Sequence, residues 1–281
     1  MPVAKAFARE LGSVLVLVHA VEREPPRAVH GDAHLRSREA AEAYLEQERK
    51  LCDSEGLRAE VHVVAPGESD IAQVIVGLAD EFDTDVVAMC AHGRHSLRDR
   101  SLGPIAQRAL RGGGPPIMLR TAGAAPDRPV EIRHVLLPVD FRHELEIALQ
   151  TVATLASGFG ASVTLLHAVD AGSTGLPARM LPNTSLELSR LALEDARRRI
   201  AMLAMRFQER NIVSDGVVST QEPDDAIIDE AKRRNTDLIV LVSHGRGGVT
   251  AWYERSVGRR IIQEPGLNLL LLRQPRLIDA R

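Results

Sequence analysis

The chain has 281 residues, of which 44% are hydrophobic and 3% aromatic, and its formal net charge is −3. This mixed, weakly acidic composition argues against a nucleic-acid surface, and the scarcity of aromatic residues argues against a base-stacking platform. No apolar run approaches the roughly 20 residues of a membrane span, and the start has no signal-peptide pattern. Two cysteines cannot form a disulfide framework, so we expect a cytoplasmic protein without membrane or nucleic-acid partners.

In the first half, residues 10–22 (ELGSVLVLVHAVE) predict a strand, and residues 36–50 predict a helix with a solvated, charged face. Residues 70–85 predict a second helix, which an apolar run follows. Three glycines at 112–114 are typical of a flexible helix stop, and residues 115–120 (PPIMLR) predict a final apolar strand. This half therefore alternates helices and strands.

Residues 121–131, rich in Ala, Pro and charge, predict a linker between domains at 1–120 and 132–281. The second half alternates predicted strands (134–140, 161–170, 217–220, 237–244 and 267–273) with predicted helices (144–160, 185–211, 224–235 and one after Arg255). Gly160 is expected to end the first helix, and Asn183 and Thr184 are expected to cap the long second one. Such alternation predicts an α/β fold with a parallel sheet and right-handed crossovers.

The two halves repeat each other. Residues 83–94 (DTDVVAMCAHGR) align with 235–246 (NTDLIVLVSHGR), and residues 10–22 align with 158–170 (GFGASVTLLHAVD). The helical segments between them match in the same order. The chain is therefore interpreted as a tandem duplication.

The run VLLPVD (135–140), the AHGR and SHGR turns and the segment 101–120 resemble the universal stress protein family over nearly the whole chain. The resemblance implies two tandem Rossmann-like domains, each with an open parallel five-stranded sheet of order 3-2-1-4-5. It also implies a family with ATP-binding and non-binding members. In the binders, the turn after strand four follows G-x-x-G-x9-G-[S/T], and an Asp ending strand one lies near the adenosine.

The motif has a physical reason. Ligands of open α/β sheets lie beyond the carboxyl ends of the strands, where the strand order reverses. Glycines let the backbone approach the phosphates, and the free N–H groups and dipole of the following helix attract the anion.

In the first half, the motif positions are Cys90, Gly93, Gly103 and Pro104, with Arg94 beside them. Cys replaces the first Gly, and Pro removes a hydroxyl and a backbone donor. Because a hydrogen bond to a charged group contributes roughly 1.5–3 kcal/mol, this loss weakens binding by about tenfold to a hundredfold. Gly93 and Gly103 are also compatible with a plain backbone turn.

In the second half, the motif positions are Val242, Gly245, Arg255 and Ser256. Arg255 replaces a Gly, and it either crowds the pocket or pairs with a phosphate. With Arg246 available to the phosphates, we expect a weakly bound ATP, with or without Mg²⁺, in this half. It would lie against Pro138, Val139, Asp140 and Val169. Asp140 could instead cap the next helix.

The first half lacks a counterpart of strand one. By the offset of the following helix, Met1 falls near Leu149, so the equivalents of residues 134–148 and of Asp140 are missing. Strands two and four would then lose the partner they share, leaving backbone groups unpaired. A start codon assigned too late, a truncated chain or another segment in that position would each account for the gap.

Several other residues are expected to serve the fold and not a binding site. His92 and His244 are interpreted as turn residues, and His19 and His167 as packing residues at the end of strand two. His92 and His95 alone do not make a metal site, so no metal ligands are assigned. Cys90 is expected to be a small buried apolar residue.

Three function classes remain open: a nucleotide-binding stress-response protein, a degenerate scaffold acting through unknown protein partners, and an enzyme of related architecture. The third is disfavoured because the sequence has no Walker P-loop, no triad-like spacing and no carboxylate cluster for Mg²⁺, so no catalytic residues are assigned. The fifth strands, 115–120 and 267–273, are expected to meet across an internal pseudo-twofold axis and make one chain a pseudo-dimer. A further homodimer is left open.

Overall fold

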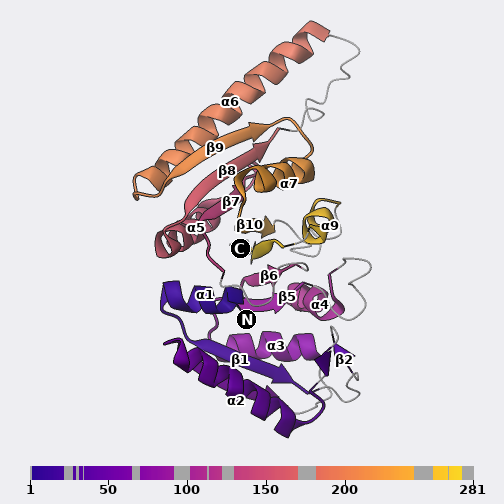
Figure 1. Cartoon of the computed structure of the whole chain (residues 1–281). Helices are drawn as coiled ribbons and strands as arrows, with labels where there is room; N and C mark the ends of the chain where they lie inside the picture. Colours follow the sequence, from indigo (N-terminus) through magenta and orange to yellow (C-terminus); the bar gives the residue numbers. More distant parts are fainter. Residues whose placement is uncertain are drawn as a thin grey trace, which may run out of the picture.

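The computed structural model describes residues 2–21, 28–29, 32–33, 35–64, 70–91, 102–112, 114–121, 130–169, 182–243, 256–264 and 266–273. Strands and helices alternate along the chain in an α/β fold, and the two halves are stacked end to end (Figure 1). No helix within the described ranges is long and apolar enough to cross a membrane.

The second half forms one continuous parallel arrangement with the strand order β9-β8-β7-β10-β11. Its elements are β7 (His134–Pro138), α5 (Glu146–Phe159), β8 (Ser162–Ala168), α6 (Pro182–Gln208), β9 (Ser214–Ser219), α7 (Pro223–Arg234), β10 (Leu238–Ser243), α9 (Ser256–Gln263) and β11 (Asn268–Arg273).

Local sequence explains where these elements begin and end. The short apolar run of β7 is almost entirely buried, as expected of a central parallel strand with helices on both faces. Helix α5 ends at Gly160, whose φ of 63° lies in the left-handed region that glycine adopts without strain. Helix α7 starts at Pro223 and carries acidic residues in its first turn and basic residues in its last, which complements the helix dipole.

The first half is divided. Its elements are α1 (Pro2–Leu11), β1 (Leu15–Ala20), the short strands β2 (Ala28–Val29) and β3 (Asp32–Ala33), α2 (Arg38–Ser54), β4 (Ala59–Val64), α3 (Ile71–Glu81), β5 (Val87–Cys90), α4 (Pro104–Gly112) and β6 (Ile117–Arg120). Strands β1 and β4 form a separate parallel pair, whereas β5 and β6 extend the large sheet to seven strands. Among the described residues, no strand pairs with both β1 and β5, whereas β7 pairs with both β8 and β10 in the second half.

The two halves meet through β6 and β11, which pair antiparallel with Ile117 opposite Leu271 and Leu119 opposite Leu269. Beyond the ladder, the N–H of Thr121 donates to the carbonyl of Leu267 at 3.0 Å. The expectation that the two fifth strands meet in an internal pseudo-dimer is therefore confirmed. Each otherwise exposed sheet edge is covered by the other.

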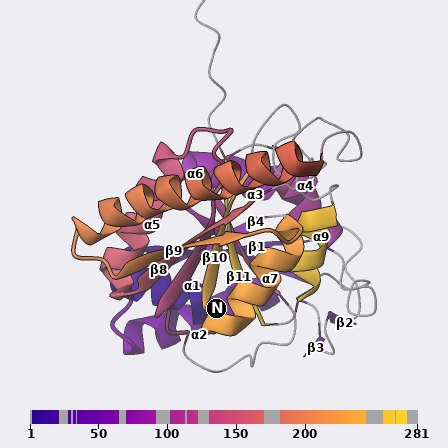
Figure 2. The same ribbon diagram turned by 90° about the horizontal axis from the view of Figure 1, so that it is seen from above.

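Two apolar clusters cover the two faces of the seven-stranded sheet. One joins α1, α5 and α6 to the sheet, and the other joins α4, α7 and α9 to the opposite face. Figure 2 shows α5 and α6 on one side of the strands and α7 and α9 on the other. Because each cluster includes residues of both halves, the halves share one core.

Two sequence expectations are wrong. Cys90 is exposed, because β5 is the outermost strand of the seven-stranded sheet and no described strand covers its free edge. Asn183 and Thr184 do not precede the long helix, because α6 begins at Pro182 and includes them in its first turn. Proline is well suited to that starting position, since it lacks the N–H that the first helical residue cannot use.

Candidate nucleotide site

The predicted site lies at the carboxyl ends of β7 and β10. These neighbouring strands pair only through Leu238 with Val135 and Ile239 with Leu136. Pro138 follows in β7 and has no N–H, so it cannot donate to β10 there. The ladder therefore ends before the strands do, at the place where the order of strands reverses along the chain.

On the other side of β7, strand β8 keeps its pairing with both β7 and β9 up to this edge of the sheet. The N–H of Val139 donates to the carbonyl of Leu166 at 2.8 Å, and the N–H of Val169 donates to the carbonyl of Ser219 at 2.8 Å. A ring nitrogen of His167, Nδ1, lies 2.8 Å from the carbonyl oxygen of Val139. Val139 and Val169 thus end two paired parallel strands at the same edge of the sheet.

Asp140 is held by Arg142 rather than capping a helix. Its carboxylate accepts hydrogen bonds from the backbone N–H of Arg142 at 3.0 Å and from the guanidinium at 2.7–3.1 Å. Partial burial raises the pKa of Asp140, but the hydrogen bonds from Arg142 lower it more, to about 2. Asp140 is therefore an ionised acceptor at neutral pH, and a nucleotide hydroxyl would have to compete with Arg142 for it.

A cation and ring cluster, formed by Phe141, His167 and Arg199, lies next to Asp140. The rings of Phe141 and His167 have centroids 4.4 Å apart, and the guanidinium of Arg199 lies 4.2 Å from the Phe141 centroid. Arg199 comes from α6, so the cluster joins the end of β7, β8 and the long helix. Sequence reasoning missed Phe141 and Arg199, because only the fold brings α6 to the end of β7.

The phosphate side of the site is described only in part. Val242 lies in β10, and α9 begins at Ser256, so these two motif positions mark the strand end and the helix start. Gly245, Arg246 and Arg255 lie outside the described residues.

The first half presents a different arrangement at the equivalent place. The N–H of Gly103 donates to the carbonyl of Ala91 at 2.7 Å, and the side chain of Gln107 donates to the carbonyl of Leu102 at 2.6 Å. Helix α4 begins at Pro104, which has no N–H. Neither Gly103 nor Pro104 thus has a free backbone donor for a phosphate. Gly93 and Arg94 of the same loop lie outside the described residues.

An open hollow of about 570 Å³ lies elsewhere, between α2, β4 and α3. Charged side chains line part of it, and two of them, Arg38 and Glu42, pair with each other at 2.7 Å. It is far in the fold from Asp140, and the switch point is the better candidate because strand topology and motif residues coincide there. Among the described residues, no group of three or more His, Cys, Asp or Glu side chains could hold a metal ion.

Comparison with known proteins decides the family. The sequence profile of the Universal stress protein family matches residues 3–118 and 131–273. The chain belongs to the universal stress protein family. The two matched segments correspond to the two halves of this tandem universal stress protein.

Solved structures support the same fold. A universal stress protein from Archaeoglobus fulgidus DSM 4304 is similar with a TM-score of 0.70 at 14% identity, covering 98% of this chain and 92% of that one. A functionally unknown protein from Pseudomonas aeruginosa PAO1 is similar with a TM-score of 0.60 at 14% identity, covering 96% of this chain and 85% of that one. No curated protein gave a significant match. At these identities the likeness shows the fold alone.

Proposed function

We propose that this universal stress protein binds an adenine nucleotide weakly, at the carboxyl edge of β7 and β10 in the second half. The observation that carries the proposal is the coincidence of three features at one switch point: the early end of the β7–β10 ladder, the ionised Asp140 and the start of α9 at Ser256. The proposed contacts are Pro138, Val139, Asp140, Val169, Val242, Gly245, Arg246, Arg255 and Ser256.

The roles follow from the chemistry of each group. Asp140 would accept a hydrogen bond from a ribose hydroxyl, and the N-terminal turn of α9 would face the phosphates, where its dipole favours an anion. Arg246 and Arg255 would add positive charge, and Mg²⁺ would accompany the nucleotide as its usual counterion. The pairing of Arg142 with Asp140 opposes binding, because a ligand must displace a charge-assisted hydrogen bond that is already made.

The first half is proposed to have lost this activity. The N–H of Gly103 is occupied by the carbonyl of Ala91, and Pro104 has no backbone N–H to donate. The residual contacts Gly93, Arg94 and Gly103 would then serve only the turn.

Calorimetric titration of the full chain with ATP and Mg²⁺ tests the assignment. Asp140→Asn and Ser256→Ala should each weaken binding by about tenfold to a hundredfold, the effect of losing one hydrogen bond to a charged group. Arg142→Gln should strengthen binding several-fold, because it frees Asp140 while leaving it ionised.

Gly103→Ala is the control and should leave ATP affinity unchanged; its Tm is measured alongside to verify folding. Loss of ATP binding in the Gly103 variant alone would place the nucleotide site in the first half instead of the second. Absence of heat at millimolar ATP in the unaltered chain would favour the second candidate, a scaffold that acts through protein contacts. That candidate rests on the β6–β11 pairing, which joins strands of both halves in one sheet.

A further inference from the structure

Exposed apolar side chains are concentrated on the long helix α6. The most exposed large apolar residues in the described part of the chain are Val213, Met202, Met205 and Leu191, at 77, 59, 57 and 55%. Three of them belong to α6, and Val213 lies in the turn that follows it. Single exposed apolar residues are normal on a protein surface, whereas a group of them on one element is typical of an interaction site.

The exposed apolar residues of α6 belong to one seam, which we call the outer seam. Successive members are four, three, four and three residues apart, the spacing of a coiled-coil seam. The outer seam consists of Leu191, Asp195, Arg198, Met202 and Met205, all of them exposed. A helix with this spacing presents all five side chains on one face.

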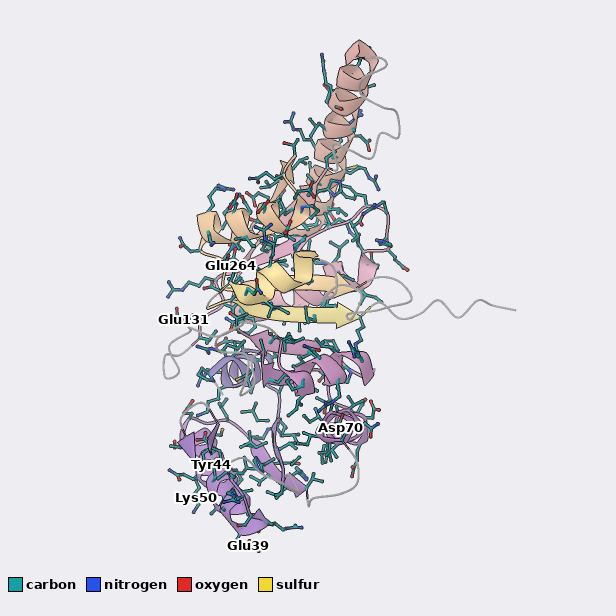
Figure 3. All side chains as sticks on the ribbon, turned by 90° about the vertical axis from the view of Figure 1, so that its right-hand side faces the viewer. Glu39, Tyr44, Lys50, Asp70, Glu131 and Glu264 are labelled. Carbon is teal, nitrogen blue, oxygen red and sulfur yellow. The ribbon has the colours of Figure 1, made fainter. Side chains whose placement is uncertain are left out.

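The opposite face of α6 attaches the helix to the sheet. Its fully buried residues, among the described side chains, are Ala196, Ile200, Ala204 and Phe207. All four lie in the C-terminal half of α6, whereas the N-terminal half projects beyond the sheet (Figures 1 and 3). A short helical segment without packing is only marginally stable in water, so a contact along the projecting half would stabilise it.

The outer seam is complementary to itself when a second copy of α6 lies antiparallel to the first. A twofold axis between positions 196 and 197 places Leu191 of one copy opposite Met202 of the other. The same axis places Asp195 of one copy opposite Arg198 of the other. Because the symmetry repeats each contact, apolar side chains meet apolar ones and acids meet bases on both sides of the axis.

This axis also supports the projecting half of each helix. Residues 185–196 of one copy lie along residues 197–208 of the other, so a segment beyond the sheet packs on a segment that the sheet holds. The outer seam faces away from the buried side of α6. The two sheets therefore lie on opposite sides of the helix pair and do not collide.

We propose that the outer seam of α6 is a homodimer interface, in which α6 packs antiparallel against α6 of a second copy of this chain. Burial of Leu191 and Met202 supplies the affinity, because it removes apolar surface from water. The pairs of Asp195 with Arg198 mainly fix the register, since opposite charges across an interface exclude other alignments. One helix pair buries less area than a typical stable interface, so the dimer is weak and depends on concentration.

Sedimentation equilibrium of the full chain across the micromolar range tests the proposal. The average mass should rise with concentration from that of one chain toward that of two. Met202→Gln should raise the dissociation constant at least about tenfold, because it puts an amide at an apolar contact that occurs twice. Leu51→Gln, which changes an exposed apolar residue of α2, is the matched control and should leave the constant unchanged. A chain that stays monomeric throughout the range overturns the proposal.

Two charge reversals test the register of the helix pair. Asp195→Arg puts two bases opposite each other, and Arg198→Asp puts two acids opposite each other, so each variant alone should dimerise at least about tenfold more weakly. Mixed in equal amounts, the two variants should form a heterodimer, because every base then faces an acid. Within one chain these residues are exposed and 4.0 Å apart, so neither reversal should disturb the fold.

The mixing experiment separates a lost contact from a lost fold, because a misfolded chain is not rescued by another variant. The Tm of each variant is measured alongside and should match that of the unaltered chain. Absence of dimer recovery on mixing would overturn the pairing of Asp195 with Arg198, as would dimerisation that neither reversal weakens.

Discussion

His134 is enclosed at the amino end of β7 with a complete set of hydrogen-bond partners. Its Nδ1 lies 2.9 Å from the hydroxyl of Thr236, and its Nε2 lies 2.9 Å from the hydroxyl of Thr164. Thr164 donates its only proton to Asp215, at 2.7 Å, so it can only accept from His134. The proton of the neutral imidazole is therefore on Nε2, and Nδ1 accepts from Thr236.

This arrangement predicts a loss of stability in mild acid. Burial lowers the pKa of His134, and the nearby charge of Arg234 lowers it further. The unfolded chain therefore takes up a proton on this residue at higher pH than the folded chain. Its contribution to stability is complete above the unfolded value of about 6.5 and is lost as the pH falls below it.

Urea unfolding at pH 7.5 and pH 5.5 checks the sign. The unaltered chain should have a smaller free energy of unfolding at pH 5.5, and the difference should shrink in His134→Gln, which cannot titrate. Since the chain contains 10 histidines, the comparison between the two proteins carries the prediction. An equal or larger pH difference in the variant would contradict it.

At the scale of elements, one side chain of β11, Arg273, donates hydrogen bonds to backbone carbonyls at the end of α4, a helix of the other half. The guanidinium of Arg273 donates to the carbonyl of Ala109 at 3.1 Å and to the carbonyl of Leu110. These carbonyls lie in the last turn of α4, where no further helical N–H can reach them. A cation there also favours the negative end of the helix dipole.

Replacing this residue should weaken the joint between the halves. Arg273→Met keeps much of the apolar stem but leaves two carbonyls of α4 without their donor, so we expect a loss of about 1–3 kcal/mol in unfolding free energy by urea titration. Arg190→Ala, which removes an exposed pair with Glu194 on α6, should change stability by less than about 0.5 kcal/mol. Similar losses in both variants would show that the cap is unimportant.

Elements with strong local signals were predictable. The apolar runs of β7 and β11 and the glycine that ends α5 are visible in the sequence. The cap of α6 was not predictable, because Pro182 and Asn183 are both acceptable first residues and only the fold chooses between them. Likewise, Asp140 was predicted from its place after β7, whereas Arg142 and Arg199 became visible only through their contacts.

At the scale of the whole molecule, the chain divides unequally into an outer lobe around the pair β1–β4 and the part around the seven-stranded sheet. The outer lobe consists of β1, β4 and α2, and a small apolar cluster joins its Cys52 and Leu57 to Ala8 of α1. Helix α1 connects this lobe to the rest: Lys5 and Arg9 pair with Glu55 at the end of α2, and Phe7 packs edge-on against Phe159 at 5.2 Å. In Figure 3, Glu39, Tyr44 and Lys50 mark α2 at the far end of the molecule.

The outer lobe should therefore open without global unfolding. The seven-stranded sheet is covered on both faces by large apolar clusters, whereas the cluster of the outer lobe is small, and no ladder among the described residues joins β1 or β4 to the large sheet. Amides in β1 and β4 should exchange with solvent about 10²-fold faster than those in β7, β8 and β10, a difference of ~2.7 kcal/mol in opening free energy. Phe7→Ala should widen that difference, because it loosens the helix that holds the lobe while β7 keeps both strand neighbours. Native-state hydrogen exchange at low denaturant measures both effects, and uniform protection across β1 and β7 would mean that the lobe and the sheet unfold as one unit.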